Sequence, residues 1–186
     1  LFKLKRSGIR AYSALAAETP DCISLTLGEP EFDTPAPIVA AGKAALDGGK
    51  THYAPNAGLM DLRRAIAKAE SREPEEILVT IGASGALFTA LLGILNPGDQ
   101  VIVPMPAFPL YETIITMAGA EVVPLETWKD GFQIRPERLN GLVNGHTKAI
   151  LLNSPNNPTG VVYDRASMEA VKAAILGKPI FLLCDQ

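Results

Sequence analysis

Three stretches of the sequence place polar or glycine-rich groups directly after apolar runs. Residues 82–87 read GASGAL, residues 153–160 read NSPNNPTG, and Asp185 follows the apolar run at 180–184. A glycine-rich turn that opens a helix can hold a phosphate on its backbone N–H groups. An amide side chain can donate a hydrogen bond to an anionic oxygen, and a carboxylate favours a cation beside it. Each stretch taken alone also fits a structural role, as a close-packing turn, a rigid loop or a helix cap.

The elements that would position these groups are apolar runs that alternate with stretches of helical periodicity. Five runs predict strands buried on both faces, at 77–81, 101–103, 121–125, 149–153 and 180–184. Helices are predicted at 35–46, 59–69, 84–95, 109–118, 136–143 and 165–175, the last with Asp164 as its cap. This order predicts an α/β fold with a mostly parallel sheet sandwiched by helices. Such sheets bind ligands beyond the carboxyl ends of their strands, where the three stretches stand.

The first 33 residues lack this alternation. They predict a short helix near 8–17, one strand at 23–27 and a turn at 28–33, before a helix start at 33–35. We therefore predict an N-terminal arm and small-domain segment at 1–33 and a ligand-binding large domain at 34–186. Because a predicted buried strand lies at 180–184, close to the last residue, we expect the polypeptide to continue and the large domain to be truncated at its C-terminal end.

The composition excludes several classes of partner. The chain has 186 residues, 47% of them hydrophobic, a formal net charge of -3 and only one short basic cluster, at residues 3–6. This argues against nucleic acid or an anionic membrane as a partner and favours a small molecule. Cys22 and Cys184 match no metal-ligand spacing, so we expect no metal site but buried, reduced thiols in a cytoplasmic protein.

Together, the three strand-end groups meet the requirements of pyridoxal 5′-phosphate (PLP). This cofactor needs an anchored phosphate, a protonated pyridine nitrogen and a hydrogen bond to its phenolic oxygen. The turn at 82–87, Asp185 and an amide from 153–160 could supply these in that order. Phe108, after the strand at 101–103, could stack on the ring, although taken alone it is more simply a core residue.

Four strings in the sequence resemble class I/II aminotransferases, which are aspartate-aminotransferase-like PLP enzymes of fold type I. They occur in the family's order and extend over most of the chain: LGEPEFDTP at 27–35, YAPNAGL at 53–59, NPGD at 96–99 and NSPNNPTG at 153–160. The resemblance implies an incomplete PLP-dependent transferase large domain. It also implies a transferase of amino acid metabolism that moves an amino group from an L-amino acid to a 2-oxo acid.

The resemblance also implies roles for individual residues of the large domain. Asp185 resembles the aspartate that pairs with the pyridine nitrogen, and Asn157 resembles the asparagine bonded to the phenolic oxygen. Phe108 stands where the family places its stacking aromatic residue. Three residues of the glycine-rich turn look like part of the phosphate cradle: Gly82, Ala83 and Ser84.

Two earlier residues match family positions that concern the partner subunit and the substrate. Tyr53 matches the tyrosine that reaches the partner subunit's cofactor phosphate, which implies a homodimer with shared active sites. Gly28 matches a glycine whose backbone lies near the substrate carboxylate, where a side chain would obstruct approach. In the family, the Schiff-base lysine and the carboxylate-binding arginine come after the position of Asp185, so no lysine here receives that role and this portion alone should be inactive. The link at 70–76 is shorter than the family's, which suggests missing loop residues.

Three other functions share these motifs. A PLP-dependent carbon–sulfur lyase has the same cofactor apparatus and would release pyruvate and ammonia without a 2-oxo acid acceptor. An aminotransferase-like domain can also serve as the ligand sensor of a transcription regulator, which would require a DNA-binding domain upstream. A non-catalytic homologue that acts only as a dimeric scaffold would lack the Schiff-base lysine.

Overall fold

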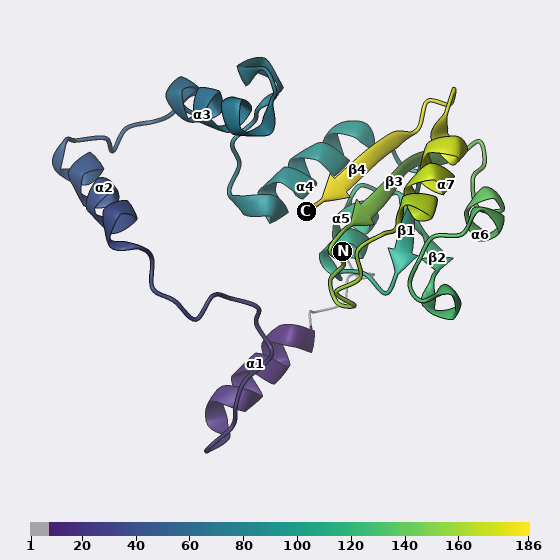
Figure 1. The fold of residues 1–186 in the computed structure, drawn as a ribbon, viewed down its shortest axis with the longest axis horizontal. Helices are drawn as coiled ribbons and strands as arrows, with labels where there is room; N and C mark the ends of the chain where they lie inside the picture. The colour runs from purple at the N-terminus through teal and green to yellow at the C-terminus, as the bar shows by residue number, and fades with distance from the viewer. Residues whose placement is uncertain (1–7) are drawn as a thin grey trace. The chain divides into compact units, whose positions relative to one another are not determined.

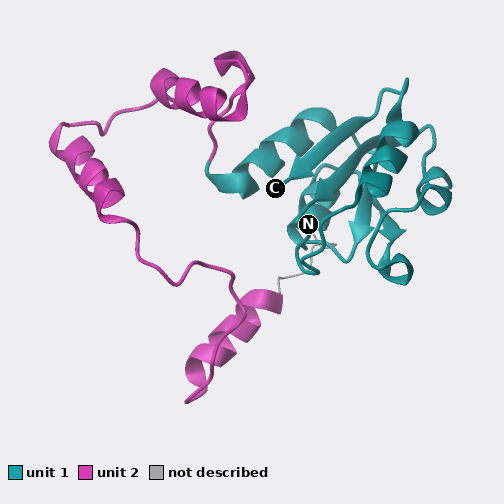
Figure 2. Cartoon of the chain, in the orientation of Figure 1, with its two compact units in different colours: residues 1–5, 81–186 teal, residues 6–80 magenta. Residues whose placement is uncertain are grey.

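The computed structural model describes residues 8–186, which form two compact units (Figure 2). Unit 1 comprises Ile81–Gln186 of the described residues, and unit 2 comprises residues 8–80. This division does not test the predicted domain boundary between residues 33 and 34, which stays a prediction. No helix in the described part is long and apolar enough to cross a membrane.

Unit 1 is built on a four-stranded sheet in which every pair of neighbouring strands is parallel (Figure 1). The strands are β1 (Gln100–Met105), β2 (Glu121–Glu126), β3 (Thr147–Asn153) and β4 (Phe181–Asp185), in the spatial order β2-β1-β3-β4. The prediction of an α/β fold with a parallel sheet is therefore confirmed.

Helices cover both faces of this sheet. Val101 and Val103 of β1 pack with α4 (Gly82–Ile94) and α5 (Leu110–Met117) in one apolar cluster. Ile102, between them, packs with α6 (Pro136–Asn140) and α7 (Arg165–Ile175) in the other. Successive side chains of a strand point to opposite faces, so one apolar strand supplies both clusters. Figure 1 shows the two pairs of helices on either side of the sheet.

The two outer strands differ from the prediction of burial on both faces. β1 and β3 are buried along most of their length, but β2 has a single buried residue and β4 has none. A strand with a neighbour on each side and helices on both faces loses most of its contact with water, whereas an outer strand does not. The prediction of buried thiols is wrong for the same reason at Cys184, which lies on β4 and is exposed, and Cys22 is exposed as well.

Unit 2 contains helices but no strand among its described residues. Its elements are α1 (Gly8–Glu18), α2 (Ala36–Asp47), α3 (Met60–Glu70) and a single 3-10 turn, η1 (Pro74–Glu76). The predicted strands at 23–27 and 77–81 are absent. In the second segment the Val79 N–H donates a hydrogen bond to the Ala57 carbonyl at 3.0 Å, but the residues form no strand, because apolar character alone does not supply a neighbouring strand.

Candidate active site

The carboxyl ends of β1, β3 and β4 lie at one edge of the sheet, because parallel strands all end at the same edge. After β1 the chain passes to α5 on one face, and after β3 it passes to α7 on the opposite face. β1 and β3 are neighbours in the sheet, so the direction of the connections reverses between them. Open parallel sheets bind ligands at such a reversal.

Asp185 is the last residue of β4 and is held at its backbone by the neighbouring strand. It pairs in register with Asn153, the last residue of β3. Its carbonyl oxygen accepts hydrogen bonds from Asn153 Nδ2 at 3.0 Å and from the Ser154 N–H at 3.1 Å. The Asp185 side chain is half-buried. These contacts therefore fix the backbone position of Asp185 at the edge of the sheet.

Tyr111 holds the carboxylate itself. Its hydroxyl donates a hydrogen bond to Asp185 Oδ2 at 2.5 Å, and the side chain is 1% exposed in the first turn of α5. Burial, and then the hydrogen bond and charge of Asp185, raise the pKa of the Tyr111 hydroxyl, which keeps it protonated and able to donate. The sequence prediction missed Tyr111. The available signal was its place one helical turn after Phe108, on the helix that follows β1.

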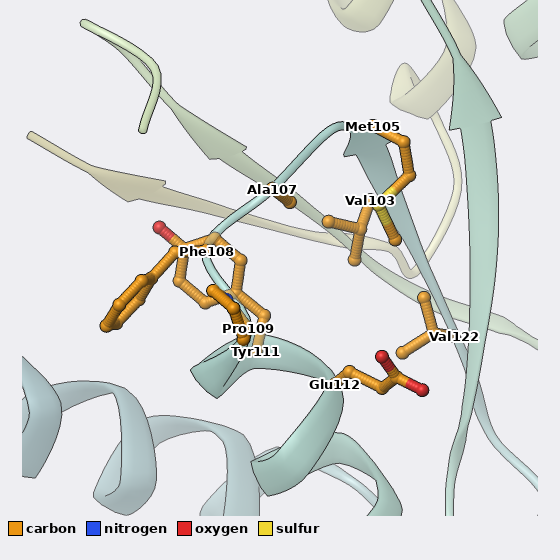
Figure 3. A pocket seen from close by; sticks show the side chains of 8 residues that line it. All are labelled: Val103, Met105, Ala107, Phe108, Pro109, Tyr111, Glu112 and Val122. Carbon is orange, nitrogen blue, oxygen red and sulfur yellow. The ribbon is translucent and has the colours of Figure 1, made fainter. Parts of the chain in front are cut away.

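Phe108 packs beside Tyr111. The two rings meet edge to face, with centroids 5.7 Å apart and an interplanar angle of 82° (Figure 3). Phe108 also lines an apolar cavity of about 130 Å³ with Val103, Met105 and Val122. Phe108 therefore contacts Tyr111, which in turn bonds to Asp185. The structure gives Phe108 the core-packing role that the sequence also allowed. Its predicted stacking role stays a prediction.

Asn153 connects the loop after β3 to Asp185. Its Oδ1 accepts a hydrogen bond from the Asn157 N–H at 2.6 Å, while its Nδ2 donates to the Asp185 carbonyl. The loop is also held from within, since Asn156 Oδ1 accepts from the N–H and the hydroxyl of Thr159. The side chain of Asn157 is exposed. The motif thus forms a rigid loop that links two predicted ligand-binding residues through one buried amide.

The glycine-rich turn opens α4, where Gly82 has a φ of 68° that other residues rarely adopt. Its N-cap residue, Ile81, makes no capping hydrogen bond with its side chain. Ala83 and Asp185 line a common open cavity of about 500 Å³, with Leu183 and Cys184 among its walls. The structure therefore brings the turn and the carboxylate to one cavity. Ser84 is exposed on the first turn of the helix.

The remaining predicted residues lie in unit 2. Tyr53 is fully exposed, and a Cβ added at Gly28 would meet no atom within 4 Å. Both stand in irregular segments between α1 and α3. Their predicted contacts with a partner subunit and a substrate stay predictions.

Comparison with known proteins identifies a family for this chain. Residues 20–186 match the family model described as aminotransferase class I and II. The chain is 38% identical to a probable N-acetyl-LL-diaminopimelate aminotransferase of Bacillus subtilis, over 99% of the chain and 49% of that protein. It is 41% identical to an aspartate/prephenate aminotransferase of Thermus thermophilus, over 98% of the chain and 50% of that protein.

A solved structure agrees with these relatives. The aspartate aminotransferase of Thermus thermophilus with maleate superposes with a TM-score of 0.92 and 41% identity, over 98% of this chain and 50% of that one. The chain therefore spans about half the length of the curated relatives that it matches.

Proposed function

Because the chain belongs to the aminotransferase class I and II family, we propose that the whole protein is a PLP-dependent aminotransferase that moves an amino group from an L-amino acid to a 2-oxo acid. One observation carries this proposal. Asp185, held by Tyr111 at 2.5 Å, and Ala83, in the first turn of α4, line the same cavity.

The described residues fit PLP as the bound group. The cavity, of about 500 Å³, lies within the usual range for small-molecule sites, about 300–1,000 Å³. A helix N-terminus that begins at a glycine-rich turn suits a phosphate, and a carboxylate that a hydroxyl keeps in place suits a cationic ring nitrogen. The first turn of α4 and the Asp185 carboxylate therefore line the same cavity.

When bound, PLP supplies a cationic aromatic ring that draws electron density from the α-carbon of the substrate. The residues of this chain would hold that ring in its reactive state. Asp185 would stabilise the proton at the ring nitrogen, and the first turn of α4 would bind the phosphate. The Asn157 amide would donate to the phenolic oxygen, and Phe108 would lie against the ring.

We extend the proposal to the assembly and the compartment. Tyr53 is fully exposed, which supports a homodimer in which this side chain reaches the partner subunit's phosphate. The two cysteines are free thiols, which supports a reducing, cytoplasmic location.

The test uses the full-length protein loaded with PLP. We expect an amino acid and a 2-oxo acid acceptor to exchange the amino group in equimolar amounts, as measured by mass spectrometry of the products. Release of pyruvate and ammonia without an acceptor would instead identify a carbon–sulfur lyase. We expect Asp185→Ala to lower kcat by about 10²–10³, because it removes a fixed charge from the reacting ring. The matched control is Glu126→Ala, an exposed carboxylate at the carboxyl end of β2, which should retain activity.

A further inference from the structure

The backbone of Asp185 has little freedom, so the direction of its carboxylate depends on side-chain rotation alone. The residue pairs with Asn153 in the β3–β4 ladder, and its carbonyl accepts two hydrogen bonds from residues 153 and 154. A half-buried aspartate in such a position can still rotate about two side-chain bonds. A second contact must therefore fix the carboxylate.

Tyr111 provides that contact from a different element. Its hydroxyl bonds to Asp185 Oδ2 at 2.5 Å, and in the described part of the chain Oδ1 has no hydrogen-bond partner. One carboxylate oxygen is thus occupied by the protein, and the other remains for a ligand. A hydrogen bond to a charged group is stronger than a neutral one, which makes this contact an effective restraint.

Tyr111 is itself fixed before it contacts Asp185. Its ring belongs to the apolar cluster beneath α4 and α5, with a 1% exposed side chain and the edge of Phe108 against it. A ring so packed cannot move away without opening a cavity in the core. The position of the carboxylate is therefore transmitted from the core of unit 1 through a single hydroxyl.

We propose that Tyr111 is a positioning residue, whose hydroxyl holds Asp185 Oδ2 so that Oδ1 is presented to the ring nitrogen of the cofactor. This inference rests on the proposed function, since it assumes a ligand with a cationic ring nitrogen. Tyr111 acts through Asp185 and does not itself contact the ligand. Removal of its hydroxyl should therefore affect only ligands that carry the ring nitrogen.

The experiment measures a ratio of two affinities in the full-length apoprotein. One ligand is PLP, and the other is its analogue in which a C–H group replaces the ring nitrogen. Equilibrium dialysis gives both dissociation constants, and their ratio is the selectivity for the ring nitrogen. General damage to the fold lowers both affinities and cancels in this ratio, so any variant that binds either ligand is informative.

We expect Tyr111→Phe to lower this selectivity about tenfold, which is the usual effect of losing one hydrogen bond to a charged group. Tyr163→Phe is the matched control, because Tyr163 is also buried, at 8% exposure, and it packs in the opposite cluster. It should leave the selectivity unchanged. If Tyr111→Phe is too unstable to purify, Tyr111→His keeps a ring N–H donor and should preserve selectivity better than Tyr111→Leu does.

A double-mutant cycle separates positioning from packing. In an Asp185→Ala background, Tyr111→Phe should cause no further loss of selectivity, because the carboxylate that it positions is gone. Equal losses for both ligands, or losses that add in the double variant, would show that Tyr111 is only a core residue. If Tyr111→Phe leaves selectivity intact while Asp185→Ala abolishes it, the inference fails and the proposed function stands. If the wild-type protein does not bind PLP, both fail.

Discussion

The two units of the chain differ in how much apolar surface they bury. In unit 1 a parallel sheet and four helices enclose two apolar clusters, one on each face. In unit 2 the described residues include a single buried side chain, Ala67, and large apolar side chains such as Ile23, Leu25 and Tyr53 are 88%, 91% and 107% exposed.

This difference shows what local sequence patterns can and cannot achieve. The helices of unit 2 form where their periodicity predicts them, yet α1 and α2 contain no buried residue. A helix gains most of its stability from packing an apolar face against another element. Exposed apolar surface of this kind is typical of a segment that other protein surface covers. The helices of unit 1 pack their apolar faces against the sheet of the same unit, whereas α1 and α2 of unit 2 bury no residue.

The largest expected effect tests the core of unit 1. Leu151 on β3 is 1% exposed, so Leu151→Ala should lower the free energy of unfolding by about 2–5 kcal/mol, as measured by urea denaturation of the full-length protein. Leu25→Ala in unit 2 is the control, and we expect less than about 0.5 kcal/mol because that side chain is 91% exposed. An equal cost for both variants would show that unit 2 is buried in the full-length protein and would break the comparison.

The next effect concerns alkaline stability. Burial raises the pKa of Tyr163 in unit 1 to about 12, above its ordinary value of 10.0. The folded state thus favours the protonated hydroxyl, and the resulting stability is present below pH 10 and is lost as the pH rises toward 12. Between pH 10 and pH 12 the free energy of unfolding of the wild-type protein should fall by roughly 2–3 kcal/mol more than that of Tyr163→Phe, as measured by denaturation curves at each pH. The two tyrosines of unit 2, Tyr12 and Tyr53, are both exposed, so unit 2 offers no buried hydroxyl of this kind.

A smaller effect is expected at a side chain of unit 2 that makes two hydrogen bonds to backbone carbonyls. Arg63 donates hydrogen bonds to the carbonyl oxygens of Ile77 at 2.9 Å and Pro74 at 2.5 Å. Arg63→Ala should cost about 1–2 kcal/mol locally, because the half-buried Ile77 carbonyl loses its partner and the Pro74 carbonyl keeps only the Ile77 N–H. Hydrogen exchange should then accelerate in residues 72–79 alone. Acceleration throughout unit 1 would contradict the treatment of the two units as separate.

The smallest expected effect concerns the N-terminal caps of two helices, α7 and α2. Asp164 begins α7 in unit 1, where the Ser167 N–H bonds to its carboxylate and holds the pKa of that group below its usual range. Its contribution to stability is therefore present above pH 3.8 and is lost as the pH falls through the lowered pKa. Asp164→Ala should flatten the acid limb of the stability curve. In unit 2, α2 begins after Pro35 without a side-chain cap, so that helix start has no capping carboxylate to compare.

Much of the fold could be predicted from sequence. All six predicted helices from residue 35 onward are present within a few residues, because apolar periodicity and caps such as Asp164 are local signals. Four of the predicted strands are present for a similar reason. The strands at 23–27 and 77–81 were wrong, because apolar character alone does not supply a neighbouring strand.

The candidate site could be predicted only in part. The strand-end positions of Asp185 and the glycine-rich turn follow from the parallel topology, and the structure places Asp185 and Ala83 at one cavity. The contact between Tyr111 and Asp185 joins residues 74 positions apart, and that of Asn153 with Asp185 joins residues 32 apart. No local pattern contains such pairs.

The sequence by itself determined which segments become strands and helices and which polar groups end the strands, because these properties depend on neighbours along the chain. Only the tertiary structure decided which of those groups meet. The register of β3 with β4 and the packing of α5 on the sheet place Tyr111, Asn153 and Asp185 together. Register and packing are set by the fit of whole elements against one another, and that fit exists only once the chain has folded.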